Sequence, residues 1–379
     1  MTTENKKRIL ILTLAWRPIE SGGEIAPREI ATRLSSYYEF DVLGYRFSKS
    51  HPKEEKTSYG TVYRIGGTGH SYAKKNLFSV MAGLKALSLH RANKYDAIWV
   101  IMATYNSGSA LIFSLFNPHV PIILTLQEGD PFPHIYKRLG VLRPLWHLFF
   151  RRVKKVQAIS KYLALFAKEA GFDGEPVVIG NGVEVSSFAR PDSMKEAQVD
   201  ENGPVVLVSH SRLVKKNAHD IVIKALALLS EKVVYIIVGG GEEEASLKEL
   251  ARSLGLERRV AFMGQLPIEK TPHYLHRAHI FVRPSRSEGL GASFLEAMAA
   301  GLPIIGTREG GIPDFLTDGE TGLFCNVDDP ESVARAVTRL IEDKALYSRI
   351  SENGKRLINE KYTWDVISTK MKNEVFDTI

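Results

Sequence analysis

The chain has one cysteine, Cys325, among 379 residues. A single thiol cannot form a disulfide within the chain, and it excludes a structural zinc site built from several cysteines. No stretch approaches the 18 uninterrupted apolar residues that indicate a membrane-spanning helix. The basic residues 6–8 precede the apolar run 9–14, but no small-residue cleavage site follows, so a signal peptide is not predicted. These absences favour a globular protein of the reducing cytoplasm.

Acidic residues are scarce in the first half of the chain. Residues 1–190 hold 26 Lys and Arg against 15 Asp and Glu, whereas residues 191–379 hold 24 against 28. Much of the excess lies in residues 134–155, where leucine and aromatic side chains alternate with Lys137, Arg138, Arg143, Arg151, Arg152, Lys154 and Lys155. Such a stretch can bind an anionic membrane surface, or it can be a core helix with a solvated basic face, and both interpretations stay open. Nucleic-acid binding is not predicted, because no zinc finger, RNA-binding strand motif or helix-turn-helix accompanies the charge.

Short apolar runs alternate with helical patterns along the whole chain, which predicts an α/β fold with parallel sheets. Strands are expected at 8–14, 41–45, 97–102, 121–126, 156–159 and 176–179, and again at 205–209, 233–238, 260–262, 280–282 and 303–306. The polar segment 183–204 lacks strong periodicity and contains two prolines, so it is the expected linker. The prediction is two Rossmann-like, doubly wound domains facing a cleft.

Two glutamates, Glu288 and Glu296, are separated by seven residues in the segment IFVRPSRSEGLGASFLEAMAAG at 280–301. The pattern is a strand, a glycine-rich turn and a helix, which places Glu288 in the loop and Glu296 inside the helix. Ligands of open α/β sheets bind beyond the carboxyl ends of strands, where the following helix offers free N–H groups to a phosphate. The sequence therefore predicts a binding site for a phosphorylated ligand at Gly289, Leu290 and Gly291. A glycosidase carboxylate pair is disfavoured, because the spacing along a helix exceeds what that chemistry needs.

Positive charge stands at a second strand end. Arg212 and Lys216 follow the strand 205–209, and fixed cations there can stabilise the negative charge that accumulates on a diphosphate leaving group. A solvated basic turn is the plainer interpretation. Two glycine-rich segments would allow a phosphate to approach the backbone closely: the pair Gly22 and Gly23, and the run that starts at Gly239. Neither matches the G-x-G-x-x-G fingerprint of dinucleotide binding.

Taken together, these motifs resemble the family-four retaining, nucleotide-sugar-dependent glycosyltransferases of the GT-B fold. The resemblance covers nearly the whole chain and includes residues 181–183 and the Gly-Gly-Ile-Pro-Asp run at 310–314. It implies an N-terminal acceptor-binding domain at 1–183, a nucleotide-sugar-binding domain at 184–361 and a C-terminal helix, 362–379, that crosses back to the first domain. By the same resemblance Glu296 binds the donor ribose, Glu288 and the backbone of Gly289 to Gly291 face the donor sugar, and Arg212 and Lys216 hold the diphosphate. Gly264 and Leu266 would line the base pocket, with Gly22, Gly23 and Gly239 near the donor.

The sequence departs from this family at one point. Members often carry a histidine after the fourth or fifth strand, where this chain has Thr-Leu-Gln-Glu-Gly-Asp at 125–130. Glu128 or Asp130 could act as the catalytic base, but the leaving phosphate can also serve, and Asp130 could merely cap the following helix. The chain also lacks the D-x-D element that holds a divalent ion in metal-dependent transferases, so neither a metal nor another cofactor is expected.

The predicted function is retaining transfer of a hexose from a UDP- or GDP-sugar to a hydroxyl of a lipid-linked or cell-surface glycan precursor. The predicted location is the cytoplasm, with a peripheral position on the inner face of the plasma membrane through 134–155 left open. Three alternatives remain: an inactive binding or regulatory protein on the same scaffold, a nucleotide-sugar epimerase, and a nonenzymatic protein with a basic surface.

Overall fold

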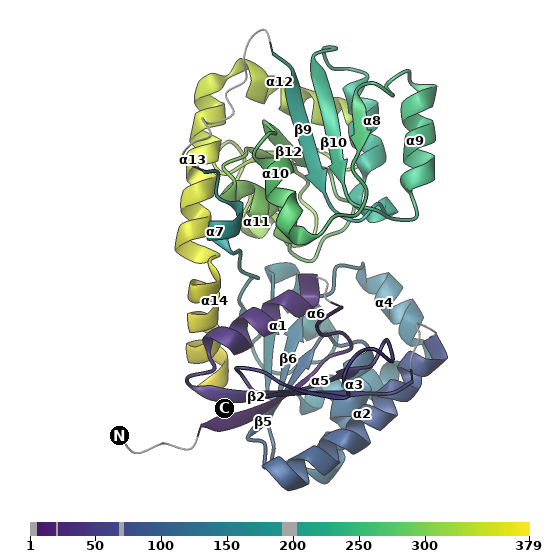
Figure 1. Ribbon diagram of the computed structural model, residues 1–379, viewed down its shortest axis with the longest axis vertical. Coiled ribbons are helices and arrows are strands. Elements are labelled where there is room, and N and C mark those ends of the chain that lie inside the picture. The colour runs from purple at the N-terminus through teal and green to yellow at the C-terminus, as the bar shows by residue number, and fades with distance from the viewer. Residues whose placement is uncertain (1–5, 20–21, 68–71, 192–202) are drawn as a thin grey trace. The chain divides into compact units, whose positions relative to one another are not determined.

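A computed structural model describes residues 6–19, 22–67, 72–191 and 203–379. The chain divides into two compact units. Unit 1 comprises Met1–Asn181 and Trp364–Ile379, and unit 2 comprises Gly182–Thr363 (Figure 1). Each unit contains one sheet with helices on its faces, which is the layered arrangement that alternating strands and helices produce.

The sheet of unit 1 has the strand order β3-β4-β2-β1-β5-β6-β7-β8. All neighbouring strands are parallel except β3 and β4, which pair antiparallel. The central strands are almost wholly apolar because helices cover both of their faces. The strands are β1 (Lys7–Leu12), β2 (Tyr38–Tyr45), β3 (Glu54–Lys56), β4 (Thr61–Ile65), β5 (Ala97–Ile101), β6 (Ile122–Leu126), β7 (Lys155–Ala158) and β8 (Val177–Val178).

The C-terminal segment completes the core of unit 1. Phe376 packs its ring against Phe40 and Trp99, with centroids 5.7 and 5.1 Å apart, and Tyr38 donates a hydrogen bond to Asp377. Burying these rings ties residues that are more than 270 positions apart to one hydrophobic core. The helices of unit 1 are α1 (Gly22–Arg33), α2 (Tyr72–Asn93), α3 (Tyr105–Phe116), α4 (Phe132–Leu139), the 3₁₀ turn η1 (Gly140–Leu142), α5 (Arg143–Arg152), α6 (Lys161–Glu169), α14 (Trp364–Lys370) and the π-helical turn η5 (Met371–Phe376).

The sheet of unit 2 is wholly parallel, with the order β11-β10-β9-β12-β13-β14. Its strands are β9 (Val205–His210), β10 (Val233–Val238), β11 (Val260–Phe262), β12 (Ile280–Arg283), β13 (Ile304–Gly306) and β14 (Leu323–Phe324). Its helices are α7 (Val185–Phe188), α8 (His219–Leu226), α9 (Glu244–Ser253), α10 (Thr271–Leu275), α11 (Ala292–Ala299), α12 (Pro330–Glu342) and α13 (Lys344–Lys361), with 3₁₀ turns η2 (Lys215–Asn217), η3 (Ile268–Lys270) and η4 (Ile312–Asp314). The strand order reverses direction between β9 and β12, a topological switch point of the kind at which α/β sheets bind ligands.

Several predicted elements differ from the structure. The basic stretch 134–155, for which a single core helix was one interpretation, is divided, because Gly140, at φ +49°, ends α4, and Pro144 stands in the first turn of α5. The strands β3, β4 and β14 were not predicted. The segment expected as a linker contains α7, and Val183 forms an isolated bridge with Thr363; residues 192–202 lie outside the described part.

Candidate functional site

The candidate site of unit 2 is the row of loops at the carboxyl ends of its strands. Backbone hydrogen bonds link these loops in the order of the strands. Gly239 N–H donates to Gly264 after β11, and Leu213 N–H after β9 donates to Gly240 after β10. Arg286 N–H after β12 donates to the Lys216 carbonyl, at 2.7 Å. The sheet therefore brings the predicted glycines, cations and glutamates of unit 2 to one continuous edge.

Arg283, the last residue of β12, holds the side chain of Glu288. The arginine is 4% exposed, and its guanidinium makes an ion pair with the Glu288 carboxylate. Its other N–H groups donate to Ser285 Oγ at 3.1 Å and to Ser293 Oγ at 2.6 Å, and its Cζ lies 4.6 Å from the centre of the Phe294 ring. The guanidinium is thus fixed from three sides before it meets the carboxylate.

The backbone around Glu288 completes this arrangement. Glu288 Oε1 accepts the N–H of Gly289 at 3.0 Å, and Leu290 is buried. Gly291 stands at φ +100° before α11, a conformation that favours glycine. Gly310 comes so close to the Glu288 carbonyl that an added Cβ would overlap it. Sequence reasoning identified Glu288 but missed Arg283, although an arginine at the end of a buried apolar strand is a signal in itself.

Glu296 lies in α11 and is half-buried. Its carboxylate forms an ion pair or hydrogen bond with His210 Nε2 at the end of β9, and the side chains are 16% and 17% exposed. The contact joins α11 to the neighbouring strand, so both groups reach the same edge of the sheet. His210 was not assigned a role from the sequence, because nothing in the local pattern shows which residue faces Glu296.

Arg212 and Lys216 lie in the loop after β9. Arg212 is exposed and Lys216 is half-buried. The loop is held from inside by Asn217, whose Nδ2 donates to the Arg212 carbonyl at 2.7 Å, and by Arg286, whose guanidinium pairs with Asp220 and Asp328 at 2.8 and 2.6 Å. Arg286, also missed from the sequence, supports the loop rather than adding a free cation to it.

Beneath this loop a chain of hydrogen bonds runs through buried polar side chains. Tyr235 donates to Ser209 Oγ at 2.7 Å and therefore accepts from Nδ1 of His219 at 2.8 Å. The other ring nitrogen, Nε2, is then free to accept the hydroxyl proton of Ser211 at 2.9 Å. Burial lowers the pKa of His219 to about 3, with the positive charge of Arg283 adding to the effect. The imidazole is neutral at physiological pH and acts as a fixed support for the loop.

This buried histidine predicts acid lability. Its pKa in the folded state is lower than the ordinary 6.5, so its contribution to stability is present above pH 6.5 and is lost as the pH falls toward 3. Between pH 7 and pH 5 we expect a loss of about 2 kcal/mol from this group, at about 1.4 kcal/mol per pKa unit. The measurement is the free energy of unfolding of His219→Gln and wild type at both pH values. The variant should lose less on acidification, while the exposed control His273→Gln should follow wild type; equal losses in His219→Gln and wild type would contradict the assignment.

The glycines predicted near the donor differ in whether the packing of their loop requires a glycine. Gly239, at φ +146°, lies against the carbonyl of Ser211, where a Cβ would overlap the backbone. Gly264 is at φ +69° with open space around it, and Leu266 beside it is half-buried. Gly239 is therefore required by loop packing, whereas Gly264 and Leu266 leave the end of β11 accessible.

In unit 1 the predicted residues also gather at the carboxyl edge of the sheet. Gly22 and Gly23 open α1, and a Cβ on Gly23 would overlap the end of the Met102 side chain. The side-chain amide of Asn181 donates to Gln127 Oε1 at 3.2 Å, which joins the loops after β6 and β8. The structure thus brings the segments after β1, β5, β6 and β8 together.

The two candidate catalytic bases, Glu128 and Asp130, lie in different environments. Glu128 is 7% exposed, and its carboxylate accepts the N–H groups of Ala103 at 2.6 Å and Gln127 at 2.9 Å. Burial raises the pKa of Glu128, and these N–H groups oppose the rise. Its oxygens tie the loop after β5 to the loop after β6. Asp130 is half-buried, and it does not cap α4, because Pro131 occupies the cap position.

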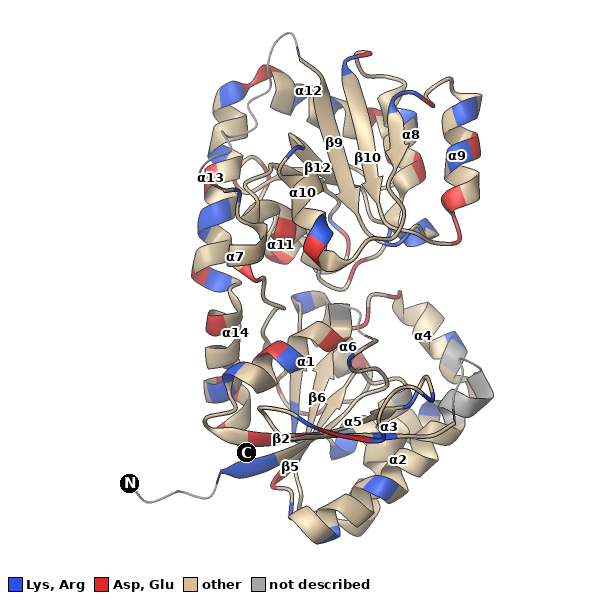
Figure 2. Ribbon diagram, viewed as in Figure 1, with Lys and Arg blue, Asp and Glu red and all other residues tan. Residues whose placement is uncertain are grey.

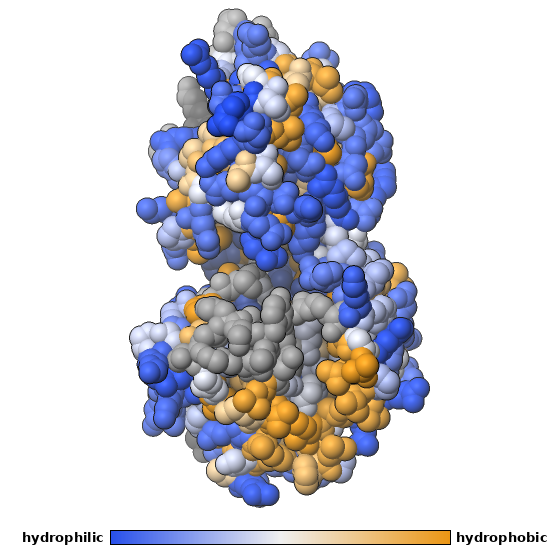
Figure 3. All heavy atoms as spheres, turned by 90° about the vertical axis from the view of Figure 1, so that its right-hand side faces the viewer, coloured by the Kyte–Doolittle hydropathy of each residue, from blue (hydrophilic) through white to orange (hydrophobic). Residues whose placement is uncertain are grey.

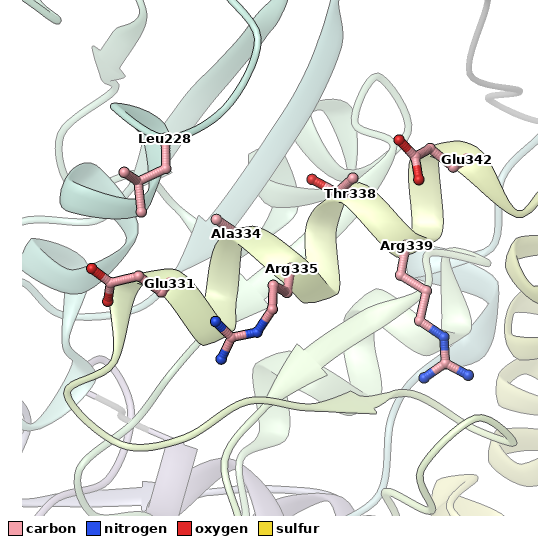
Figure 4. A pocket seen from close by; sticks show the side chains of 7 residues that line it. All are labelled: Leu228, Glu331, Ala334, Arg335, Thr338, Arg339 and Glu342. Atoms are coloured by element: carbon pink, nitrogen blue, oxygen red, sulfur yellow. The ribbon is translucent and has the colours of Figure 1, made fainter.

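Two hollows of the described surface are lined by neither Glu288 nor Glu296. A groove of about 450 Å³ runs along α12, and Figure 4 shows its charged side chains pointing in different directions rather than converging. A smaller hollow of about 350 Å³ lies where β13 and β14 end; there Arg308 stacks on the Phe324 ring at 3.8 Å. Within the described ranges, no three His, Cys, Asp or Glu side chains are grouped as a metal site requires. In that same part of the chain, none of the helices has the length and apolarity to cross a membrane.

Family comparisons agree with the geometry of both sheets. The profile of Glycosyltransferase Family 4 matches residues 21–187, and that of Glycosyl transferases group 1 matches residues 190–357. The chain belongs to the family-four glycosyltransferases.

Similar proteins with assigned functions match only part of their length. A GDP-mannose-dependent alpha-(1-6)-phosphatidylinositol monomannoside mannosyltransferase of Mycolicibacterium smegmatis is 31% identical over 54% of this chain and 56% of its own. The lipopolysaccharide core biosynthesis glycosyltransferase LpsE of Rhizobium meliloti is 30% identical over 58% and 63%. The chain therefore spans less than two thirds of these relatives. An uncharacterized glycosyltransferase of Methanocaldococcus jannaschii is 28% identical over 99% of both chains.

Solved structures confirm the predicted fold. HepE of Anabaena, solved with UDP and glucose, has a TM-score of 0.80 at 20% identity, over 98% of this chain and 100% of that one. Sucrose-phosphate synthase of Thermosynechococcus elongatus has a TM-score of 0.84 at 19% identity, over 99% and 100%. Two parallel-sheet α/β domains of the GT-B type are thus established, as the sequence motifs predicted.

Proposed function

We propose that the protein is a retaining hexosyltransferase that uses a UDP- or GDP-linked sugar as donor and needs no metal. One observation carries this proposal: Glu288, held by Arg283, and Glu296, held by His210, reach the same sheet edge as the cations of the loop after β9. The names of the similar proteins point the same way, since one uses GDP-mannose and another was solved with UDP and glucose.

Each residue then has a distinct part in donor binding. Glu296 accepts hydrogen bonds from the ribose hydroxyls, Gly264 and Leu266 border the base, and Arg212 with Lys216 binds the diphosphate. Glu288 and the backbone N–H groups of residues 289–291 face the hexose. Unit 2, as the domain 184–361, binds the donor, and the domain 1–183 with 362–379 binds the acceptor.

The reaction transfers the hexose from the diphosphate to the acceptor oxygen. The acceptor oxygen attacks the anomeric carbon from the face that the diphosphate leaves, the bond from that carbon to the phosphate oxygen breaks, and the hydroxyl proton passes to the departing phosphate. Negative charge grows on the diphosphate as the bond breaks, so Arg212 and Lys216 stabilise the transition state more than the bound donor. Glu128 is less suited to accept the proton, because its oxygens already accept two backbone N–H groups.

The acceptor is proposed to be a hydroxyl of a lipid-linked or cell-surface glycan precursor. Two similar proteins act, by their names, on phosphatidylinositol monomannoside and in lipopolysaccharide core synthesis. The basic stretch 134–155 fits a lipid-linked substrate, because anionic membrane surfaces attract such segments. The protein would work in the cytoplasm at the inner face of the plasma membrane.

Product analysis tests this function. Purified protein is incubated with a UDP- or GDP-hexose and a lipid-linked acceptor in the presence of EDTA, and the product is examined by NMR. We expect the anomeric configuration of the donor to be kept and EDTA to have no effect. An inverted product would contradict retention, a loss of activity with EDTA would contradict metal independence, and a changed sugar without acceptor would identify an epimerase.

A further inference from the structure

Unit 1 carries an extended apolar surface that the proposed chemistry does not use. Of the 18 large hydrophobic residues exposed in the described part of the chain, ten lie on α2, α3, η1 and α5. Figure 3 shows hydrophobic side chains gathered on this unit. We call this the α2–α5 surface, and its residues are Leu77, Val80, Met81, Leu84, Leu115, Phe116, Val141, Leu142, Leu145 and Leu148.

Helix α2 shows that this exposure follows a pattern. Leu77, Val80, Met81 and Leu84 have the spacing i, i+3, i+4, i+7, so they form one stripe, and each is 38% to 59% exposed. The opposite face of α2, with Phe78, Ala82 and Ala86, is buried in the core. A helix that is apolar on both faces is normally covered on both, so the outer stripe of α2 needs a second partner.

The segment from η1 into α5 continues the surface. Val141 is 94% exposed and Leu145 is 54% exposed, although Trp146, Phe149 and Phe150 of the same segment are buried. The aromatic residues therefore belong to the core, and the aliphatic residues between them face solvent. Helix α3 packs between α2 and α5, so the two exposed stripes belong to one layer of helices.

The charged residues of the elements that carry this surface are all basic. The five elements α2, α3, α4, η1 and α5 contain nine Lys and Arg residues and no Asp or Glu. Figure 2 shows no acidic residue on the described parts of α2 and α4. Arg91 follows the apolar stripe on α2, and Arg151 and Arg152 follow Leu148 on α5. Because α2 and α5 each lead into a parallel strand of one sheet and share a layer, they run in the same direction. Their basic ends therefore lie on the same side of the apolar residues.

We propose that the α2–α5 surface is a docking face for an anionic lipid bilayer, with the α2 stripe and the η1–α5 leucines at the headgroup–acyl boundary and the arginines on anionic headgroups. Apolar side chains on elements whose charged residues are all basic match such a bilayer in both polarity and charge. A second copy of the chain fits less well, because the five elements carry no acidic residue that could pair with the cations of a partner copy. This proposal rests on the membrane location proposed above through 134–155 and extends it to α2 and α3, and it is tested separately from the glycosyl transfer.

Flotation with vesicles tests the proposal on the full chain. Wild type is mixed with vesicles of phosphatidylcholine alone or of phosphatidylcholine with phosphatidylglycerol in equal parts, at low and at high salt. We expect binding to the anionic vesicles and at least tenfold less to the neutral ones. The variant Leu84→Glu/Leu145→Glu should lose at least tenfold, while Leu228→Glu/Leu254→Glu, at exposed leucines of unit 2, should bind like wild type.

A second variant separates charge from apolar contact. Arg151→Gln/Arg152→Gln/Lys154→Gln removes three exposed cations and should lower anionic-vesicle affinity by about 100-fold and flatten its salt dependence. Wild-type binding by the variant Leu84→Glu/Leu145→Glu, or absence of wild-type binding at low salt, would overturn the proposal. A dimer of wild type by light scattering that dissociates in Leu84→Glu/Leu145→Glu would reassign the surface to a second copy. Nucleotide-sugar binding, measured on the same samples, should be equal in wild type and in all variants. Wild type that binds vesicles but no nucleotide sugar would count only against the proposed function.

Discussion

Replacing Arg283 with leucine is expected to lower kcat by about 100-fold, because the arginine is the buried cation that fixes the Glu288 carboxylate. The variant leaves the Glu288 carboxylate without its charged partner. It also removes the hydrogen bonds that Arg283 donates to the hydroxyls of Ser285 and Ser293. Breaking a buried ion pair in this way costs about 3 to 5 kcal/mol. We therefore expect a lower midpoint of thermal unfolding as well as lower turnover.

A double variant separates the two effects. In Arg283→Leu/Glu288→Gln no unpaired charge remains, so part of the lost stability should return while turnover stays low. The control is Arg252→Leu, which removes two exposed ion pairs, with Glu249 and Glu257, and should change neither quantity. Steady-state kinetics and thermal unfolding are measured on all three proteins. Full turnover in Arg283→Leu would show that Glu288 needs no such positioning.

Glu296→Ala and Arg212→Ala are expected to affect different steps. Loss of Glu296 should weaken binding of the donor nucleotide by about 10- to 100-fold, since hydrogen bonds to a charged group contribute roughly 1.5 to 3 kcal/mol. Loss of Arg212 should mainly lower kcat, by about 100-fold, because its charge acts most strongly on the departing diphosphate. The measurements are calorimetric titration for donor affinity and initial rates at saturating donor for kcat.

The neighbouring cation supplies a matched control for Arg212. Lys215 is exposed in the same loop, so Lys215→Ala changes the local charge equally without touching the proposed diphosphate contact. It should keep donor affinity and turnover near wild type. Unchanged kinetics in both Glu296→Ala and Arg212→Ala would reject the site assignment, and an equal loss in Lys215→Ala and Arg212→Ala would show only a general effect of charge.

The fold was predictable because its signals are local. The strands that lie in the middle of each sheet are short apolar runs followed by helical patterns, and this alternation fixes an α/β class without further information. The strand β3, Glu54–Lys56, gives no such signal, since its three residues are charged and exposed at a sheet edge. The break between α4 and α5 depends on the backbone conformation of Gly140, which a helical pattern does not reveal.

The candidate site was predictable only in part. Glu288, Arg212 and Lys216 follow strand ends, Glu296 lies in the helix after β12, and their alignment along one edge follows from parallel pairing. Their partners could not be derived in the same way. The contact of Glu296 with His210 joins residues 86 positions apart, and only the order of β9 beside β12 brings α11 next to that strand. The exposed stripe of α2 was also missed, because an apolar helix pattern does not show which face the core will cover.

The central claim is that unit 2 binds a nucleotide sugar at the carboxyl edge of its sheet. The most direct measurement is calorimetric titration of the full chain with UDP, GDP, ADP and their common hexose derivatives, with and without EDTA. We predict selective binding of UDP or GDP and of its sugar, insensitive to EDTA and weakened in Glu296→Ala. Folded protein that binds none of these nucleotides, or that binds them equally well in Glu296→Ala, would contradict the claim.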